Sequence, residues 1–104
     1  MDFSDELVNA EIILIWEITS NVKQCENQTY NVSLKNNTMQ TLSPNLFLAL
    51  KSNDGKYEYI YIDQIDIERK GNVTKNLDVE NAAEAKLYVW SNELRPYSSV
   101  INVK

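Results

Sequence analysis

Apolar and polar residues alternate over short stretches of this chain, which is the pattern of β-strands that bury one face. Clusters of Asn, Asp, Ser and Lys separate these stretches and mark turns. The pattern predicts seven strands, at residues 10–19, 29–35, 45–52, 56–68, 72–79, 85–91 and 100–103. Residues 80–86 offer a helical alternative, but a short turn between two sheets explains them better. We therefore predict an all-β fold, a two-sheet antiparallel β-sandwich of about seven strands.

The turns between the predicted strands carry their own signals. Asp54-Gly55 lies between two apolar strands and predicts a hairpin, because glycine accepts the positive φ that such turns require. The strands on either side should therefore be antiparallel neighbours. Pro44 has a fixed φ and no N–H, so it marks a turn and not a position within a central strand.

Alternation also sorts the residues into a buried and an exposed face. Trp16 alternates with Ile12, Leu14 and Ile18, which favours a place in the core over a ligand site. Three further sets of apolar residues are in phase on their strands and are predicted to form the core: Tyr30, Val32 and Leu34; Leu46, Leu48 and Leu50; and Leu87 and Val89.

The long strand predicted at 56–68 changes phase along its length. Ile60 and Ile62 share one parity, whereas Ile65 and Ile67 have the other. Because a shift of one residue turns every side chain to the opposite face, a bulge near Asp63-Gln64 is expected to restore the inward face.

Three tyrosines on this strand form an aromatic strip. Tyr57, Tyr59 and Tyr61 alternate with the isoleucines and so lie on the face opposite to them. Such rings can stack on the apolar faces of sugars, and Phe47, Tyr88 or Trp90 could extend the platform. The favoured interpretation is that the rings stabilise the sheet as cross-strand pairs or are covered by a neighbouring domain.

Length and charge restrict the class of protein. The chain has 104 residues, of which 43% are hydrophobic, and can build one core. Ten basic residues against fifteen acidic ones give a net charge of -5, which disfavours binding to nucleic acid or to an anionic membrane and favours a neutral or basic partner. Cys25 is the only cysteine, so the fold relies on packing without an internal disulfide.

Several kinds of catalytic site are missing from the sequence. Without histidine there is no Ser-His-Asp or Cys-His constellation, and the commonest zinc ligand is absent. Gly55 and Gly71 are the only two glycines, so the sequence contains neither a P-loop motif nor a dinucleotide-binding fingerprint. We predict a protein that is not an enzyme and holds no cofactor or metal.

The remaining polar candidates have structural explanations that we favour. Cys25 follows Lys23 and Gln24 in an expected polar turn and is interpreted as incidental. Asn53-Asp54-Gly55 is a fragment of a calcium loop without the further acidic ligands, so a hairpin turn is the better interpretation. Acidic residues on strands and turns could supply a paired carboxylate but are interpreted as a solvated face: Asp63, Asp66, Glu68, Glu80 and Glu84.

Four Asn-x-Ser/Thr triplets occur in the chain. They begin at Asn27, Asn31, Asn36 and Asn72, and they would mark surface glycans in a secreted eukaryotic protein. A sequence rich in asparagine produces such triplets by chance, so we attribute them to composition.

The N-terminal part is expected to lie outside the folded domain. Residues 1–9 are interpreted as a frayed end or the remnant of a linker, and residues 10–104 as a single β-sandwich domain. Acidic residues occupy the place where a signal peptide would be positive, and the apolar run at 12–16 is too short to cross a bilayer. We expect no signal peptide and no membrane insertion, which makes the protein cytoplasmic if the chain is complete.

Four stretches resemble a known family of modules. They are residues 30–38, residues 46–50 with the turn at 54–56, residues 71–79, and residues 86–91 followed by Leu94 and Pro96. Together they are similar to the immunoglobulin-like and fibronectin-type-III-like β-sandwich modules at the C-terminal ends of large secreted and cell-surface proteins of Clostridium-type Firmicutes. Trp90 and Pro96 match the motif that closes these modules, where both look structural.

The resemblance implies a noncatalytic accessory module that spaces, docks or supports other domains. Its partners would be neighbouring domains of a parent protein or another surface protein, and its location extracellular or at the cell surface. The alternative is a carbohydrate-binding module that holds a polysaccharide on the exposed aromatic residues Tyr57, Tyr59, Tyr61, Tyr88 and Trp90.

Overall fold

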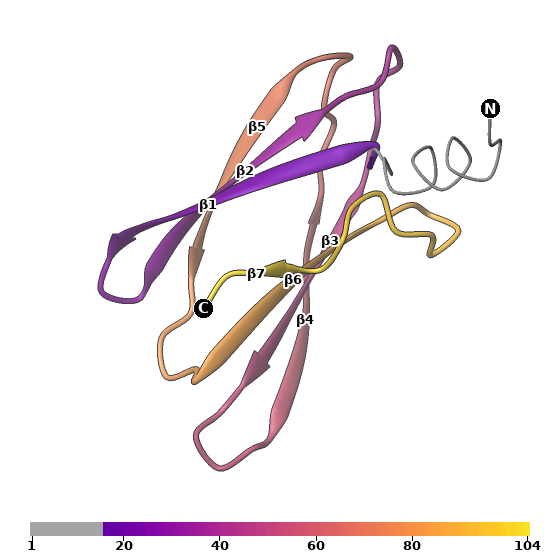
Figure 1. Cartoon of the computed structure of the whole chain (residues 1–104). Coiled ribbons are helices and arrows are strands. Elements are labelled where there is room, and N and C mark those ends of the chain that lie inside the picture. The colour runs from indigo at the N-terminus through magenta and orange to yellow at the C-terminus, as the bar shows by residue number, and fades with distance from the viewer. Residues whose placement is uncertain (1–15) are drawn as a thin grey trace, which may run out of the picture.

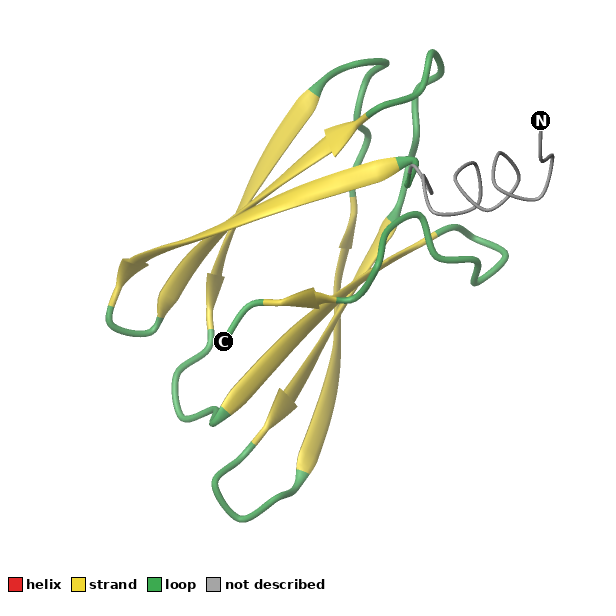
Figure 2. Ribbon diagram, in the orientation of Figure 1, coloured by secondary structure: helices red, strands yellow, loops and turns green. Residues whose placement is uncertain are grey.

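The computed structural model describes residues 16–104 and consists of two antiparallel β-sheets that pack face to face (Figures 1 and 2). The smaller sheet has the order β1-β2-β5, and the larger one β4-β3-β6-β7. The strands are β1 (Ile18–Glu26), β2 (Thr29–Asn36), β3 (Asn45–Lys51), β4 (Tyr57–Gln64), β5 (Asn72–Asp78), β6 (Glu84–Trp90) and β7 (Ile101–Asn102). The predicted all-β sandwich of about seven strands is confirmed.

The fourth strand determines how the strands divide between the sheets. β4 pairs with β3 through the hairpin at Asp54-Gly55, as the sequence predicts. Gly55 has a φ of 84°, and its N–H donates to the carbonyl of Ser52 at 3.0 Å. In constant-type immunoglobulin domains the fourth strand lies in the sheet of the first two. Here it lies in the other sheet, which therefore has four strands.

Among residues 16–104, no helix is long and apolar enough to cross a membrane.

The prediction for the first strand is wrong in its position. β1 starts at Ile18 and continues to Glu26, whereas residues 10–15 of the predicted strand, and the predicted domain boundary at residue 10, lie outside the described residues. Pattern reasoning missed most of β1 because its residues after Ile18 are mainly polar. The strand forms because it pairs along its whole length with β2. Cys25 is not in a turn but is an exposed residue at a register shift within β1.

The phase change in the tyrosine strand comes from a bulge, as expected. Phe47 pairs with Tyr61 and Leu46 with Asp63, so Ile62 is the extra residue, just before the predicted position. β4 then ends at Gln64 instead of continuing to residue 68. Beyond the bulge Ile67 is fully buried and forms an isolated bridge with Leu42.

The core lies between the sheets and contains the residues that alternation predicts. Tyr30 and Leu50 are half-buried against it. Trp16 is half-buried, and its expected neighbours Ile12 and Leu14 lie outside the described residues. The predicted residues that are buried are Val32, Leu34, Leu46, Leu48, Leu87 and Val89, and Ile18, Ile67, Leu77 and Val79 join them.

A charged residue closes one open edge of the sandwich. Lys75 lies on the edge strand β5 opposite the buried Val32, so its side chain starts on the inward face. Its Nζ lies 3.3 Å from Oδ2 of Asp63 on β4, the edge strand of the other sheet. An inward-pointing charge at an edge disfavours pairing with a further strand.

Asn36 is a fully buried polar residue at the end of β2. Its Nδ2 lies 2.7, 2.9 and 3.2 Å from the carbonyl oxygens of Gln40, Ile67 and Glu68. Its Oδ1 accepts from the N–H and the hydroxyl of Thr38. The side chain therefore joins two loops to β2. The triplet that begins at Asn36 serves this network, because a buried amide has no room for a glycan.

Replacing Asn36 tests the weight of this network. Asn36→Ala removes all side-chain hydrogen bonds of this buried residue and leaves the N–H of Thr38 without its acceptor. It is expected to lower the free energy of unfolding by about 3 kcal/mol in urea titrations. Asn76→Ala is the matched control, since the Asn76 amide makes an exposed bond to Asn31, and it should change the free energy by less than about 0.5 kcal/mol. Equal effects of the two substitutions would contradict the central role of Asn36.

Candidate functional site

The outer face of the larger sheet is built by alternation on β3. Leu46 and Leu48 belong to the buried core, so Phe47, Ala49 and Lys51 point outward, although Ala49 is only 5% exposed. Each of these three pairs with one residue of β4 and one of β6, which gives three rows across the sheet: Tyr61-Phe47-Tyr88, Tyr59-Ala49-Lys86 and Tyr57-Lys51-Glu84. We call the outward surface of Phe47, Tyr57, Tyr59, Tyr61, Tyr88 and Trp90 the aromatic face.

Phe47 is the centre of the packed part of this face. Its ring centroid lies 5.3 Å from that of Tyr61 and 5.5 Å from that of Trp90. Trp90 in turn contacts Tyr88 edge-on, with the centroids 5.5 Å apart. Edge-on and tilted contacts at these distances are favourable for aromatic pairs. Tyr88 and Trp90 are thus half-buried and not exposed as the carbohydrate-binding alternative expects, and Pro96 lies beside Trp90 through a backbone bridge.

The three tyrosines of β4 are the exposed part of the aromatic face. Tyr57, Tyr59 and Tyr61 are 57%, 73% and 54% exposed. The rings of Tyr57 and Tyr59 are nearly parallel, with centroids 6.1 Å apart, and Nζ of Lys51 lies 5.7 Å from the centroid of Tyr57. Large exposed apolar surfaces commonly mark interaction sites, so the strip is the first candidate for one.

A shallow groove lies within the aromatic face above Ala49. Ala49 has a one-carbon side chain, whereas Tyr59 and Lys86 beside it in the same row are long. The resulting groove has a volume of about 210 Å³. Its rim also carries Lys51, Glu84, Tyr57 and Tyr88, so aromatic walls and charged hydrogen-bonding groups surround one small residue.

Amide side chains border the aromatic face at the end where β3 starts. Tyr61 Oη donates to Oδ1 of Asn45 at 3.2 Å. Asn45 Nδ2 and Gln64 Nε2 both donate to Oδ1 of Asn92, at 2.9 and 3.2 Å. Sequence reasoning missed Ala49 and these amides as site residues. Register could have identified Asn45, because it pairs with both Trp90 and Gln64, but Asn92 follows β6 in a loop.

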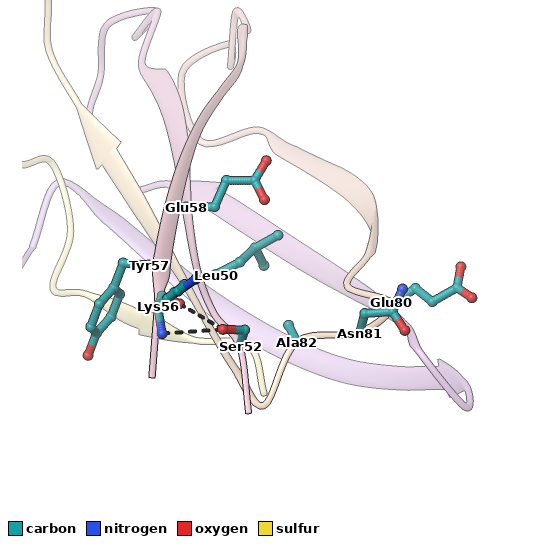
Figure 3. A pocket seen from close by; sticks show the side chains of 8 residues that line it. All are labelled: Leu50, Ser52, Lys56, Tyr57, Glu58, Glu80, Asn81 and Ala82. Carbon is teal, nitrogen blue, oxygen red and sulfur yellow. Dashed lines mark hydrogen bonds between the residues drawn. The ribbon is translucent and has the colours of Figure 1, made fainter. Parts of the chain in front are cut away.

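A second, larger hollow lies at the end of the sandwich near the β3–β4 hairpin (Figure 3). Its volume is about 470 Å³, and Tyr57 belongs both to it and to the groove above Ala49. Figure 3 shows Glu58 and Glu80 on separate segments, with carboxylates that do not face each other, while Ser52 and Lys56 bond to one another across the hairpin. The hollow therefore brings together turn residues but no facing pair of acids.

Three other acidic side chains have individual partners. Asp63 pairs with Lys75, and Asp66 accepts from the hydroxyl of Ser43 at 2.6 Å. Asp54 accepts from the Ser52 hydroxyl and from the N–H of Lys56, which is the arrangement of a hairpin turn. Within residues 16–104, no three His, Cys, Asp or Glu side chains gather in a way that could hold a metal ion.

The hairpin carboxylate gives a pH-dependent prediction. The hydrogen bond from Ser52, followed by that from the Lys56 N–H, lowers the pKa of Asp54 below its ordinary value. Because the folded pKa lies below the unfolded one, this bond contributes to stability above the ordinary pKa and is lost as the pH falls through the folded value. In a carboxyl NMR titration, Ser52→Ala should raise the pKa of Asp54 towards its ordinary value. Ser99→Ala, a remote control, should not; an unchanged pKa in Ser52→Ala would contradict the assignment.

The aromatic face should divide into structural and free rings. Phe47→Ala removes the central ring and is expected to cost about 2 kcal/mol of unfolding free energy. Tyr59→Ala should cost less than about 1 kcal/mol, because most of its ring is in solvent. Urea titrations of both variants measure the difference, and a larger loss for Tyr59→Ala would show that the exposed strip holds the sheet together.

No protein-family model matches the chain, and a search of curated proteins finds no match. The resemblance to the modules of clostridial surface proteins therefore stays a prediction from the residues that carry it.

Proposed function

We propose that this chain is a noncatalytic binding module that holds a polysaccharide on the aromatic face of its larger sheet. The observation that carries the proposal is the exposure of Tyr57, Tyr59 and Tyr61 along one strand beside a groove. The sequence alone favoured a purely structural role for these tyrosines. Their exposure and the groove favour the binding role.

A saccharide suits the chemistry of this surface. One face of a sugar ring carries C–H groups that pack on aromatic rings, while its hydroxyls need donors and acceptors at the edge. Tyr57, Tyr59 and Tyr88 supply rings, and Lys51, Lys86 and Glu84 supply polar groups around Ala49. Both kinds of contact are thus available within one groove.

The place of the module in the cell is part of the same proposal. By its resemblance to modules of clostridial surface proteins, it would work in a larger extracellular or cell-surface protein. Its role there would be to hold or space other domains while the aromatic face contacts polysaccharide. Trp90 and Phe47 would support the face from beneath, since both are half-buried and in contact.

A second candidate function is the docking of a neighbouring domain on the same surface. Phe47, Tyr61, Tyr88 and Trp90 form one continuous chain of ring contacts, which is the kind of apolar patch that protein interfaces cover. In this case the tyrosines would be buried against protein and not against sugar.

The experiment is a glycan-array and polysaccharide-pulldown screen. The wild type is compared with the triple variant Tyr57→Ala, Tyr59→Ala, Tyr61→Ala, and circular dichroism checks that both fold. We expect the wild type to bind at least one polysaccharide and the triple variant to lose at least about tenfold in affinity, since each stacked ring contributes on the order of 1 kcal/mol.

A control variant separates the two faces of the protein. Thr19→Ala, Asn21→Ala and Lys23→Ala change three alternate outward positions of β1 on the other sheet. This variant should bind as the wild type does. Absence of binding by the wild type to every glycan would overturn the polysaccharide proposal and leave the docking of a neighbouring domain as the better account.

A further inference from the structure

The four rings in the packed part of the aromatic face do not lie in one plane. Phe47 is tilted by 58° to Tyr61 and by 50° to Trp90, and Tyr88 is at 65° to Trp90. The surface of a crystalline polysaccharide is flat over many sugar units. Only coplanar rings can stack on such a surface together, so these four rings cannot stack on it at once, and only the nearly parallel pair Tyr57 and Tyr59 could do so.

The groove above Ala49 favours a ligand narrower than the flat surface of a crystalline polysaccharide. Its volume of about 210 Å³ lies below the range of about 300–1,000 Å³ that is usual for drug-sized ligands, which suits a single small ring. Larger side chains border it: Lys51 along β3, and Tyr59 and Lys86 across the sheet. A ring inside the groove would therefore have to project from a flexible chain, because a rigid flat surface cannot enter a depression.

The charged side chains on the rim of the groove favour an uncharged saccharide as the ligand. Lys51 and Lys86 lie near Glu84, so donors and an acceptor surround the groove together. Among the described residues, neither lysine takes part in an ion pair, which leaves both free to donate to hydroxyl groups. The net charge of -5 further disfavours a strongly anionic polymer.

We propose that the ligand of the aromatic face is a single, soluble, neutral saccharide chain with one sugar ring seated over Ala49, and not the face of a crystalline polysaccharide. This inference rests on the proposed function and narrows it. The chain would continue from the groove along the exposed strip, over Tyr57 on one side or Tyr61 on the other.

Matched soluble and crystalline polymers test the inference. Hydroxyethylcellulose, soluble xylan and soluble galactomannan are titrated in affinity gels, and microcrystalline cellulose and crystalline chitin are used in pulldowns. We expect binding to at least one soluble polymer and retention of less than about a tenth of the protein on the crystalline ones, because tilted rings lose stacking contact.

A substitution in the groove tests the position of the ring. Ala49→Met fills the groove and should weaken binding to the soluble polymer at least about tenfold, since the sugar ring seated over Ala49 loses its contacts. Ala83→Met, in the exposed turn before β6, is the matched control and should bind as the wild type does. If Ala49→Met does not fold, as judged by circular dichroism, the smaller Ala49→Val replaces it.

The outcomes separate this inference from the proposed function. Strong retention on crystalline polymer that the tyrosine triple variant abolishes would overturn the inference and keep the proposed function. Unchanged binding of soluble polymer by a folded Ala49→Met variant would also overturn it. Failure of the wild type to bind any polymer would overturn both.

Discussion

The burial of Leu46 and Leu48 between the two sheets is the constraint on which the rest of the structure depends. Because side chains alternate along a strand, burying these leucines turns Phe47, Ala49 and Lys51 outward. β3 lies between β4 and β6, so each of these three outward residues pairs with one residue of β4 and one of β6. The rows of aromatic and polar side chains on the outer face follow from that register, and so does the groove above the one small residue among them.

The two outer faces of the sandwich differ in chemistry although they share one core. On the smaller sheet, Ser33 bonds to Thr74 and Asn31 to Asn76, so hydroxyls and amides satisfy one another across the strands. On the larger sheet, rings contact rings through Phe47, and the tyrosines of β4 stay exposed. A surface of satisfied polar groups gains little from a partner, whereas exposed rings gain by being covered. This difference is why the larger sheet is the candidate binding face.

The sequence predicts the parts of this protein that depend on alternation. The fold, the inward leucines, the hairpin at Gly55 and the outward tyrosines all follow from a period of two or from turn chemistry. It does not predict β1, whose polar residues are held in place by pairing with β2. The groove above Ala49 and the buried Asn36 network depend on which strands become neighbours and which loops meet. Such long-range facts become visible only in the folded chain.

The most direct test of the account is an NMR titration of the ¹⁵N-labelled protein with cellohexaose, xylohexaose and mannohexaose. The account predicts that one of these chains shifts backbone amides of β3, β4 and β6, with the largest changes near Ala49 and Tyr59. The amides of β1, β2 and β5 should stay in place. Shifts confined to the smaller sheet, or equal shifts on both sheets, would contradict the central claim that the aromatic face binds saccharide.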